Sequence, residues 1–262
     1  MADPEIQSRF DLLKDVAPKA GNMALHFWEN RQDLVIEAKG GMQDVVSEAD
    51  RAIERFICEM VAAEFPDDGF LGEEYGFQPG RSPFYWVIDP IDGTAPFLHG
   101  LPSWCVAIAL MEGQTCVAAA THAPLQSETF IALRGAGATC NDRPLRIPEG
   151  LTLKNGISAI GASNASDPKR VGAAVTTLLE QGGMFYRNGS GALMLAYVAA
   201  GRLAGYFETI MYPWDCLGGL LLVEEAGGRC RPLQNDPTEA TREPILATAP
   251  AAWDDFERLF PV

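Results

Sequence analysis

The sequence is poor in several residue types that carry common enzyme chemistry. Among its 262 residues there are only three histidines, His26, His99 and His122, and none lies in an Arg-Gly-His setting, which disfavours phosphate transfer through a histidine. No two cysteines have Cys-x-x-Cys spacing, and several lie in apolar runs, where a free cysteine acts as a small hydrophobic residue. We therefore expect neither a zinc site nor a disulfide framework. The six cysteines are Cys58, Cys105, Cys116, Cys140, Cys216 and Cys230.

Basic residues are also scarce. The chain has 20 Lys and Arg against 35 Asp and Glu, which gives a formal charge of -15. A protein that binds nucleic acid through the phosphate backbone normally presents a basic face, so we expect no nucleic-acid partner. Acidic residues become informative where they converge, because clustered carboxylates repel one another unless a cation lies among them.

Long apolar segments are missing as well. No apolar run approaches the ~20 residues that a membrane span needs. The first residues of the chain alternate charged and apolar side chains and lack the apolar centre of a signal peptide. We expect a cytoplasmic protein with no membrane partner.

The hydrophobic pattern predicts two halves of different character. Apolar spacing favours one helix over most of the first thirty residues and a second from near Ser47 to the turn at Pro66. Strands with short Gly- or Pro-bearing links follow, which favours antiparallel hairpins. After Pro148, strands and helices alternate, which favours an α/β unit. We expect an α+β half over 1–150, with strands at 85–88, 104–111, 115–122 and 128–133, and an α/β half over 151–262, with strands at 157–161, 184–187 and 205–208 and helices at 168–181, 193–200 and 215–226.

One hexapeptide carries the sharpest chemical signal. The apolar strand Trp86-Val87-Ile88 ends on Asp89, where Pro90 has no N–H to continue the sheet ladder. The sequence Asp92-Gly93-Thr94 then opens a helical turn. Two carboxylates three residues apart on a turn can face one point and bind a hard divalent cation such as Mg²⁺. The N–H groups at the start of the turn form an anion seat. A simple Asx-type turn is the structural alternative.

Four further segments place acids at the ends of elements. Each acid has an ordinary interpretation when it is taken alone. Glu73-Glu74 could be solvated, Asp50 could complete a capping box with Ser47, Asp215 could be the N-cap of the last long helix, and Glu208 could lie on the surface at the end of a strand.

Taken together, the segments resemble the inositol monophosphatase family in order and spacing. Asp89-Pro90-Ile91-Asp92-Gly93-Thr94 with Phe97 is similar to the first family signature. Trp214-Asp215 with Gly219, followed by Glu225-Ala226-Gly227-Gly228, is similar to the second. Gly72-Glu73-Glu74 and Val46-Ser47-x-x-Asp50 resemble two shorter motifs. The resemblance runs from about Lys39 to Gly228.

The resemblance implies a layered αβαβα sandwich, of α+β or α/β class, with the inositol-monophosphatase-like sugar phosphatase fold. The N-terminal half would carry the metal and phosphate site, and the C-terminal half would complete it. The activity would be Mg²⁺-dependent hydrolysis of a small phosphate monoester, with two or three ions per site and sensitivity to lithium. A homodimer is common among relatives.

It also implies roles for individual residues. Glu73, Asp89, Asp92, Asp215 and the Ile91 carbonyl would bind metal. Asp50 and Thr94, with Glu73, would act in catalysis by orienting and deprotonating the attacking water. Gly93 and Thr94 would hold phosphate through backbone N–H groups. The substrate would contact Asp92, Glu208, Asp215 and Ser190, while Lys39 and Asp44 would lie around the metal cluster and Glu74 would matter less than Glu73.

Two segments depart from the family pattern. Ala95-Pro96 stands where members commonly have Thr-Asn or Lys-Ser, so side-chain contacts from that position would be lost, although proline is tolerated in a first helical turn. Leu217-Gly218-Gly219 replaces a commoner Ala-Ala-Gly and is expected to change packing rather than chemistry.

Several alternatives remain at this stage. A haloacid-dehalogenase-type phosphatase has Asp-x-Asp, whereas Asp89 and Asp92 are three apart. For a cysteine phosphatase, we expect the Cys-x5-Arg signature at none of the six cysteines. Some members of the resembled family act as protein partners, including with the transcription machinery, so a non-catalytic regulatory role is the alternative of a different class. Among substrates, inositol-1-phosphate or a similar polyol or sugar phosphate is preferred, with histidinol phosphate and 3′-phosphoadenosine 5′-phosphate as alternatives.

Overall fold

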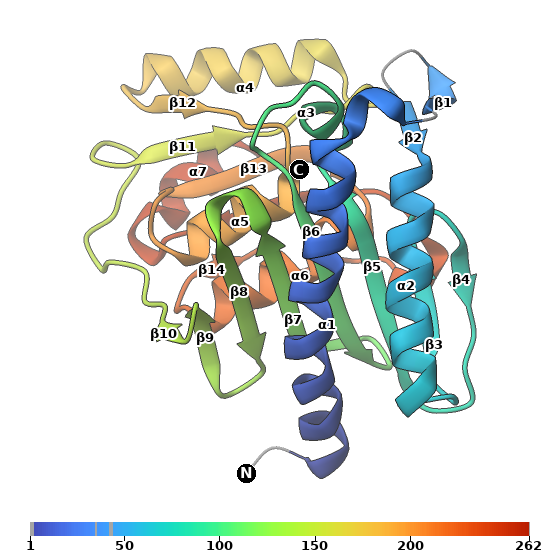
Figure 1. Ribbon diagram of the computed structural model, residues 1–262. Coiled ribbons are helices and arrows are strands. Elements are labelled where there is room, and N and C mark those ends of the chain that lie inside the picture. Colours follow the sequence, from blue (N-terminus) through green and yellow to red (C-terminus); the bar gives the residue numbers. More distant parts are fainter. Residues whose placement is uncertain (1–2, 35, 42–43, 262) are drawn as a thin grey trace.

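The computed structural model describes residues 3–34, 36–41 and 44–261, without the side chains of 36–41 and 44–47 (Figure 1). The described chain stacks helices and sheets in alternate layers. An outer pair of long helices covers an eight-stranded sheet, two helices lie between this sheet and a five-stranded sheet, and two further helices cover the far side. The expected αβαβα sandwich is confirmed.

The helices of the three helical layers have these bounds: α1 Pro4–Glu29 and α2 Glu48–Glu64 outside the large sheet, α5 Gly191–Ala199 and α6 Pro213–Glu225 between the sheets, and α4 Pro168–Glu180 and α7 Trp253–Leu259 outside the small sheet. A short helix, α3 Thr94–Leu98, follows β5. Single-turn 3-10 helices cover Arg31–Asp33, Pro124–Gln126, Pro237–Glu239 and Pro250–Ala252.

The large sheet has the order β10-β9-β8-β7-β6-β5-β3-β4, and all its neighbours are antiparallel except β3 and β5. Its strands are β3 Gly69–Gly72, β4 Gly76–Gln78, β5 Phe84–Asp92, β6 Cys105–Glu112, β7 Thr115–Ala123, β8 Glu128–Leu133, β9 Gly137–Cys140 and β10 Arg143–Pro144.

The small sheet has the order β12-β11-β13-β15-β14. The pairs β11–β12 and β11–β13 are parallel, and β15 runs antiparallel to both of its neighbours. The strands are β11 Ile157–Ile160, β12 Met184–Tyr186, β13 Gly205–Met211, β14 Arg229–Cys230 and β15 Glu243–Thr248. A separate hairpin joins β1 Ile36–Gly41 to β2 Asp44–Ser47.

The sandwiched helices explain the most apolar stretches of the second half. Helix α6 packs against both sheets, so nearly its whole circumference is buried rather than one stripe. The N-terminus of α6, which carries Asp215, points to the same end of the sandwich as the C-terminal end of β5. The packing of one helix between two sheets thus brings residues distant in sequence to one place.

Strand β5 differs from the expected strand end at Asp89. It continues through Pro90 to Asp92, with all nine residues buried. Asp89 pairs with Ala107 and Asp92 with Cys105, so β5 has one residue more than its partner over this interval. This bulge accommodates a proline that cannot donate a ladder hydrogen bond.

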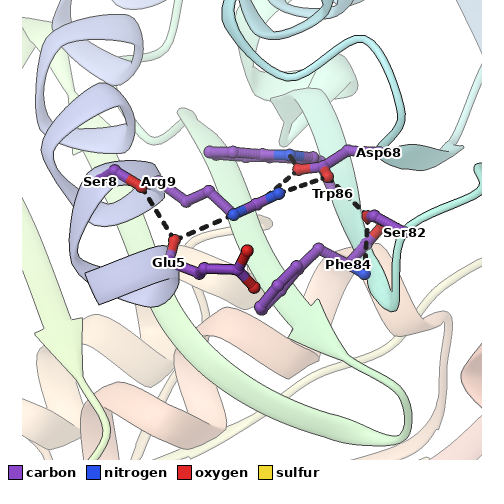
Figure 2. A network of polar contacts seen from close by, with 7 residues as sticks. All are labelled: Glu5, Ser8, Arg9, Asp68, Ser82, Phe84 and Trp86. Carbon is purple, nitrogen blue, oxygen red and sulfur yellow. Dashed lines mark hydrogen bonds and ion pairs between the residues drawn. The ribbon is translucent and has the colours of Figure 1, made fainter. Parts of the chain in front are cut away.

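A buried ion pair fastens α1 to the large sheet. Arg9 donates from Nε and Nη2 to the two oxygens of Asp68, at 2.8 Å each (Figure 2). Asp68 also accepts from Ser82 Oγ at 2.6 Å and from Trp86 Nε1 at 3.0 Å. Burial raises the pKa of Asp68, but these hydrogen bonds outweigh it and the net shift is downward. The network fixes the residue that immediately precedes β3.

All six cysteines are free thiols. Within the described part of the chain, no helix combines the length and the apolar character needed to cross a membrane.

Candidate active site

Three carboxylates meet where β5 ends and α6 begins. Asp89, Asp92 and Asp215 each offer an oxygen, and these oxygens all lie within 4.8 Å of one another. Asp89 and Asp92 are only 2% and 8% exposed. Carboxylates this close and this buried are expected to remain ionised only with a cation among them.

The electrostatics of the cluster support that view. Burial, followed by the charges of Glu73, Asp92 and Asp215, raises the pKa of Asp89 well above its ordinary value. Burial and the charges of Asp92 and Glu73 likewise raise the pKa of Asp215. Buried acids whose charges raise one another's pKa values are typical of a cation site.

Asp92 is fastened to the N-terminus of α5. Its Oδ2 accepts from Ser190 Oγ at 2.5 Å and from the Ala192 N–H at 2.7 Å, and its Oδ1 accepts from the Gly191 N–H at 3.2 Å. Burial raises the pKa of Asp92, and these hydrogen bonds oppose the rise. The helix start therefore orients this carboxylate and favours its charged form.

Ser190 is the N-cap of α5 and is completely buried. Its hydroxyl lies against Asp92, and the thiol of Cys105 lies 3.7 Å from the same carboxylate. The substrate role of Ser190 stays a prediction, and in the structure its hydroxyl donates to Asp92.

Asp89 and Asp215 differ in how their carboxylates serve the local backbone. Asp89 Oδ1 accepts from the Ile91 N–H at 3.0 Å, so the Asx-type turn exists alongside membership of the cluster. The alternative of Asp215 as an N-cap is wrong. The N-cap is Tyr212, and Asp215 at the third helical position accepts its N–H at 3.2 Å.

The turn after Asp92 requires a glycine. Gly93 has φ 95°, and a Cβ there would lie 2.8 Å from the Ser103 carbonyl oxygen. Thr94 opens α3, and its hydroxyl donates to the Ile91 carbonyl at 3.2 Å. Phe97 of the same helix is buried edge-on against Trp104. These contacts hold Gly93 and Thr94 beside the three acids.

Two further predicted residues act on the cluster, Glu73 from the large sheet and Asp50 from the outer helix α2. Glu73 directly follows β3, and its N–H donates to the Ile88 carbonyl of β5 at 3.2 Å. Asp50, on α2, is 1% exposed, and its charge acts on Asp89. Lys39 and Asp44 lie on β1 and β2, but their side chains are outside the described residues.

Glu208 borders a small cavity next to the cluster. The interpretation of Glu208 as a surface residue is wrong, since it is 7% exposed. Its carboxylate accepts from the Tyr206 hydroxyl, and burial raises its pKa to about 7. The cavity has a volume of about 120 Å³. Its lining consists of Asp92, Gly161, Ala162, Ser163, Arg187, Gly189, Gly191, Met194, Glu208, Met211 and Asp215.

Sequence reasoning missed Gly161 and Met211 of this lining, whereas the segment from Arg187 to Gly191 was expected from the resemblance to shape the substrate pocket. Gly161 leaves the room that the Glu208 carboxylate and the Tyr206 hydroxyl occupy. Arg187 donates to the Ala162 carbonyl at 2.8 Å, and its charge acts on Glu208. Met211 packs over Gly191. A glycine at the end of the predicted strand 157–161 was the one available signal for Gly161, whereas nothing in the local pattern marks Met211.

The expectation that no cysteine carries the Cys-x5-Arg spacing is wrong, because Cys140 and Arg146 have it. Cys140 ends β9, and the chain then turns back so that Arg143 pairs with Cys140 in β10. Burial raises the pKa of the Cys140 thiol. A hairpin with a protonated thiol does not provide the anionic nucleophile of a cysteine phosphatase.

Comparison with known proteins agrees with the arrangement of these acids. The model of the inositol monophosphatase family matches residues 6–258. The chain belongs to the inositol monophosphatase family. The resemblance inferred from the motifs is confirmed, and the family supports a hydrolase of the phosphatase type whose acidic cluster could bind metal.

Individual members of the inositol monophosphatase family are similar over most of the chain. "Nus factor SuhB" of Xylella fastidiosa is 40% identical over 83% of this chain and 79% of that protein. "Inositol-1-monophosphatase" of Synechocystis is 34% identical over 93% and 85%. The crystal structure of the extragenic suppressor protein SuhB from Bartonella henselae is 32% identical, with a TM-score of 0.89 over 96% of this chain and 98% of that one.

The two departures from the family pattern lie on helices α3 and α6. Ala95 is exposed and Pro96 is buried in the first turn of α3. Gly218 of α6 packs against the large sheet, where an added Cβ would lie 3.3 Å from the Ala119 Cβ. Gly218 therefore affects how closely α6 packs on the sheet, rather than the chemistry of the carboxylates.

Proposed function

We propose that this protein is a Mg²⁺-dependent phosphatase that hydrolyses a small phosphate monoester with water as the nucleophile. The observation that carries the proposal is the convergence of Asp89, Asp92 and Asp215, of which Asp92 and Asp215 also line a small cavity. Their raised pKa values support a cation among them, because burial and the charges of neighbouring acids are what raise the pKa of Asp89 and of Asp215.

The donor set fits magnesium. Mg²⁺ prefers oxygen ligands and takes few from protein, keeping water and phosphate for the remainder. Glu73, Asp89, Asp92 and Asp215 would hold two or three ions, together with the Ile91 carbonyl. When bound, Mg²⁺ neutralises phosphate oxygens, lowers the pKa of water and stabilises the departing alkoxide.

The protein's own residues would orient the reactants and move the proton. The backbone N–H groups of Gly93 and Thr94 would hold the phosphate. Asp50 and the Thr94 hydroxyl would orient the attacking water and take up its proton, with Glu73 nearby. The Thr94 hydroxyl is held by the Ile91 carbonyl, and that oxygen has a second lone pair for a further partner.

The cavity favours a small, hydroxyl-rich substrate. Glu208, Asp92 and Asp215 line the cavity and would contact the hydroxyl groups of the substrate, and the volume of about 120 Å³ suits a single ring better than a nucleotide. We therefore prefer inositol-1-phosphate or a similar polyol or sugar phosphate over histidinol phosphate and 3′-phosphoadenosine 5′-phosphate. Ser190 would contribute by fixing Asp92.

Two copies of the chain would pair through the small sheet. Strand β12 is an edge strand, and its three side chains Met184, Phe185 and Tyr186 are 61%, 40% and 37% exposed. An exposed apolar edge strand is suited to association with another chain. A homodimer in a cytoplasmic setting completes the proposal.

A non-catalytic regulatory role is the second candidate. It is favoured by one observation, that several relatives carry the name Nus factor. Retention of all the expected carboxylates argues for catalysis, since a purely regulatory protein has no need of a cation site.

A phosphate-release assay with inositol-1-phosphate, a sugar phosphate, histidinol phosphate and 3′-phosphoadenosine 5′-phosphate tests the proposal. We expect release from a polyol phosphate with Mg²⁺ present and little from the nucleotide. Absence of release from every substrate, with the protein folded, would favour the regulatory role.

A further inference from the structure

One further buried acid near the site has no place in the chemistry described so far. Glu54 lies on α2, one helical turn after Asp50, so the two side chains project from the same face of the helix. Glu54 is 1% exposed. A carboxylate is rarely buried to this extent unless its oxygens are satisfied.

Glu54 binds the backbone of the turn that carries Glu73. Its Oε2 accepts from the Glu74 N–H at 2.9 Å, and its Oε1 accepts from the Tyr75 N–H at 3.2 Å. The two bonds fall on consecutive peptide groups immediately after Glu73. On the other side, the Glu73 N–H is bound to the Ile88 carbonyl. The backbone at Glu73 is therefore held between α2 and β5.

Gly72 makes this contact possible. A Cβ built at Gly72 would overlap the carboxylate of Glu54. The glycine of the Gly72-Glu73-Glu74 segment thus lets a carboxylate from α2 lie directly beneath the turn. The glycine is not required by a positive φ, since Gly72 is a residue of strand β3 with an ordinary backbone conformation.

We propose that Glu54 is a positioning residue for Glu73, and through it for the magnesium site. The inference rests on the proposed function, in which Glu73 binds Mg²⁺. Because Asp50 and Glu54 share one rigid helix, α2 sets the distance between the water-activating acid and the turn of Glu73. A group of this kind acts by holding a ligand in place and does not touch metal or substrate.

Replacing Glu54 tests the role without relying on turnover. In Glu54→Gln the single amide oxygen can accept from the turn, but the NH₂ group faces a backbone N–H that it cannot bind. Calorimetric titration of the purified protein with Mg²⁺ is expected to show a Kd weakened by roughly 10-fold or more. Turnover at saturating Mg²⁺ is expected to recover most of the wild-type value.

Asp68→Asn is the matched control. Asp68 is also a buried carboxylate, but it precedes the other end of β3 and binds Arg9 and Trp86 (Figure 2). This variant is expected to lower the melting temperature and to leave the Kd for Mg²⁺ unchanged. If Glu54→Gln fails to fold, Gly72→Ala displaces the carboxylate while keeping its charge, and it should weaken Mg²⁺ binding in the same way.

The outcomes distinguish a failure of the proposed function from a failure of the positioning role of Glu54 alone. Wild-type protein that takes up no Mg²⁺ would overturn the proposed function and the role of Glu54 with it. Wild-type binding with an unchanged Kd in both Glu54→Gln and Gly72→Ala would leave the phosphatase proposal standing and reject the positioning role.

Discussion

Asp89 serves the fold and the proposed chemistry with the same carboxylate. One oxygen accepts the Ile91 N–H and shapes the turn after β5, and the side chain also belongs to the group of three acids. Asp215 does the same at the start of α6, where it accepts the Tyr212 N–H. At such positions a structural and a chemical interpretation do not exclude each other, so only measurements that separate stability from activity can weigh them.

Asp50 and Thr94 allow that separation. Asp50→Asn and Thr94→Ala should still fold and bind Mg²⁺ and phosphate, because the assigned ligands and the Thr94 N–H remain. The kcat should fall by ~10²–10⁴-fold, since the path for the proton of the water is lost. Asp50 also lies in the first turn of α2, where capping alone would contribute ~1 kcal/mol. A reduced melting temperature with normal kcat in Asp50→Asn would remove it from the mechanism.

The acids of the cluster should stabilise the protein only when Mg²⁺ is bound. Asp215→Asn removes one repelling charge and keeps an oxygen for the Tyr212 N–H, so the EDTA-treated variant should melt at a higher temperature than the EDTA-treated wild type. Each 1 kcal/mol of relief corresponds to about 2–4 °C for a chain of this size class. Added Mg²⁺ should stabilise the wild type but not the variant.

Glu74→Gln is the control for the cluster. Its backbone N–H, which binds Glu54, is retained, and the side chain has no assigned ligand role. Scanning calorimetry with and without Mg²⁺ should show near-wild-type behaviour. If Glu74→Gln were as damaging as Glu73→Gln, the assignment within the pair would be wrong.

Among the elements, α1 and β7 meet through a buried histidine. His122 of β7 is 9% exposed, and its Nδ1 lies 2.8 Å from Thr129 Oγ1. Gly21 of α1 provides the space for the ring, because a Cβ there would overlap it. Burial lowers the pKa of His122 from 6.5 to about 4. The close packing of α1 on the sheet therefore requires a neutral imidazole.

This requirement predicts a pH dependence of stability. A folded-state pKa below the unfolded value means that the unfolded chain binds more protons, so the contribution of His122 is present above pH 6.5 and is lost as the pH falls toward 4. The full loss would be up to about 3 kcal/mol. In His122→Gln, urea midpoints measured between pH 7 and pH 5 should fall less than in the wild type. Equal declines would show that His122 does not titrate with unfolding.

The elements that the sequence predicts well are those with a strong local signal. Helix α4 has Asp167 as N-cap and Pro168 at its first position, as expected, and the long amphipathic pattern of α1 predicts its extent. Strand β15 was missed because its pairing with β13 and β14 is set by residues far along the chain. The bulge at Pro90 was also missed, since a strand that continues through proline depends on its neighbour β6.

The local sequence patterns that predict helices and strands do not predict the site. No periodicity brings Asp89, Glu208 and Asp215 together, since they belong to three different elements of the two halves. Their association was predicted only through the resemblance of several motifs in order. Glu54 was not predicted, because a buried acid on an amphipathic helix cannot be distinguished by spacing from a solvated one.

At the scale of the whole molecule, the edge of the small sheet is the surface on which the dimer proposal depends. Phe185→Glu should convert a dimer into a monomer at micromolar concentration, as measured by light scattering. Phe77→Glu is a matched control, because Phe77 is 43% exposed on β4, the edge strand of the large sheet. A monomeric wild type, or equal effects of both changes, would count against the assignment of β12.

The central claim is that the converging acids form a magnesium site that drives phosphate release. The most direct measurement is phosphate release from inositol-1-phosphate by protein dialysed exhaustively against EDTA, before and after Mg²⁺ is restored, with Asp92→Asn in parallel. We predict no release without Mg²⁺, recovery on its addition, inhibition by Ca²⁺, and no recovery in the variant, because Asp92 links the cation site to α5. Full activity of the EDTA-treated wild type would contradict the account.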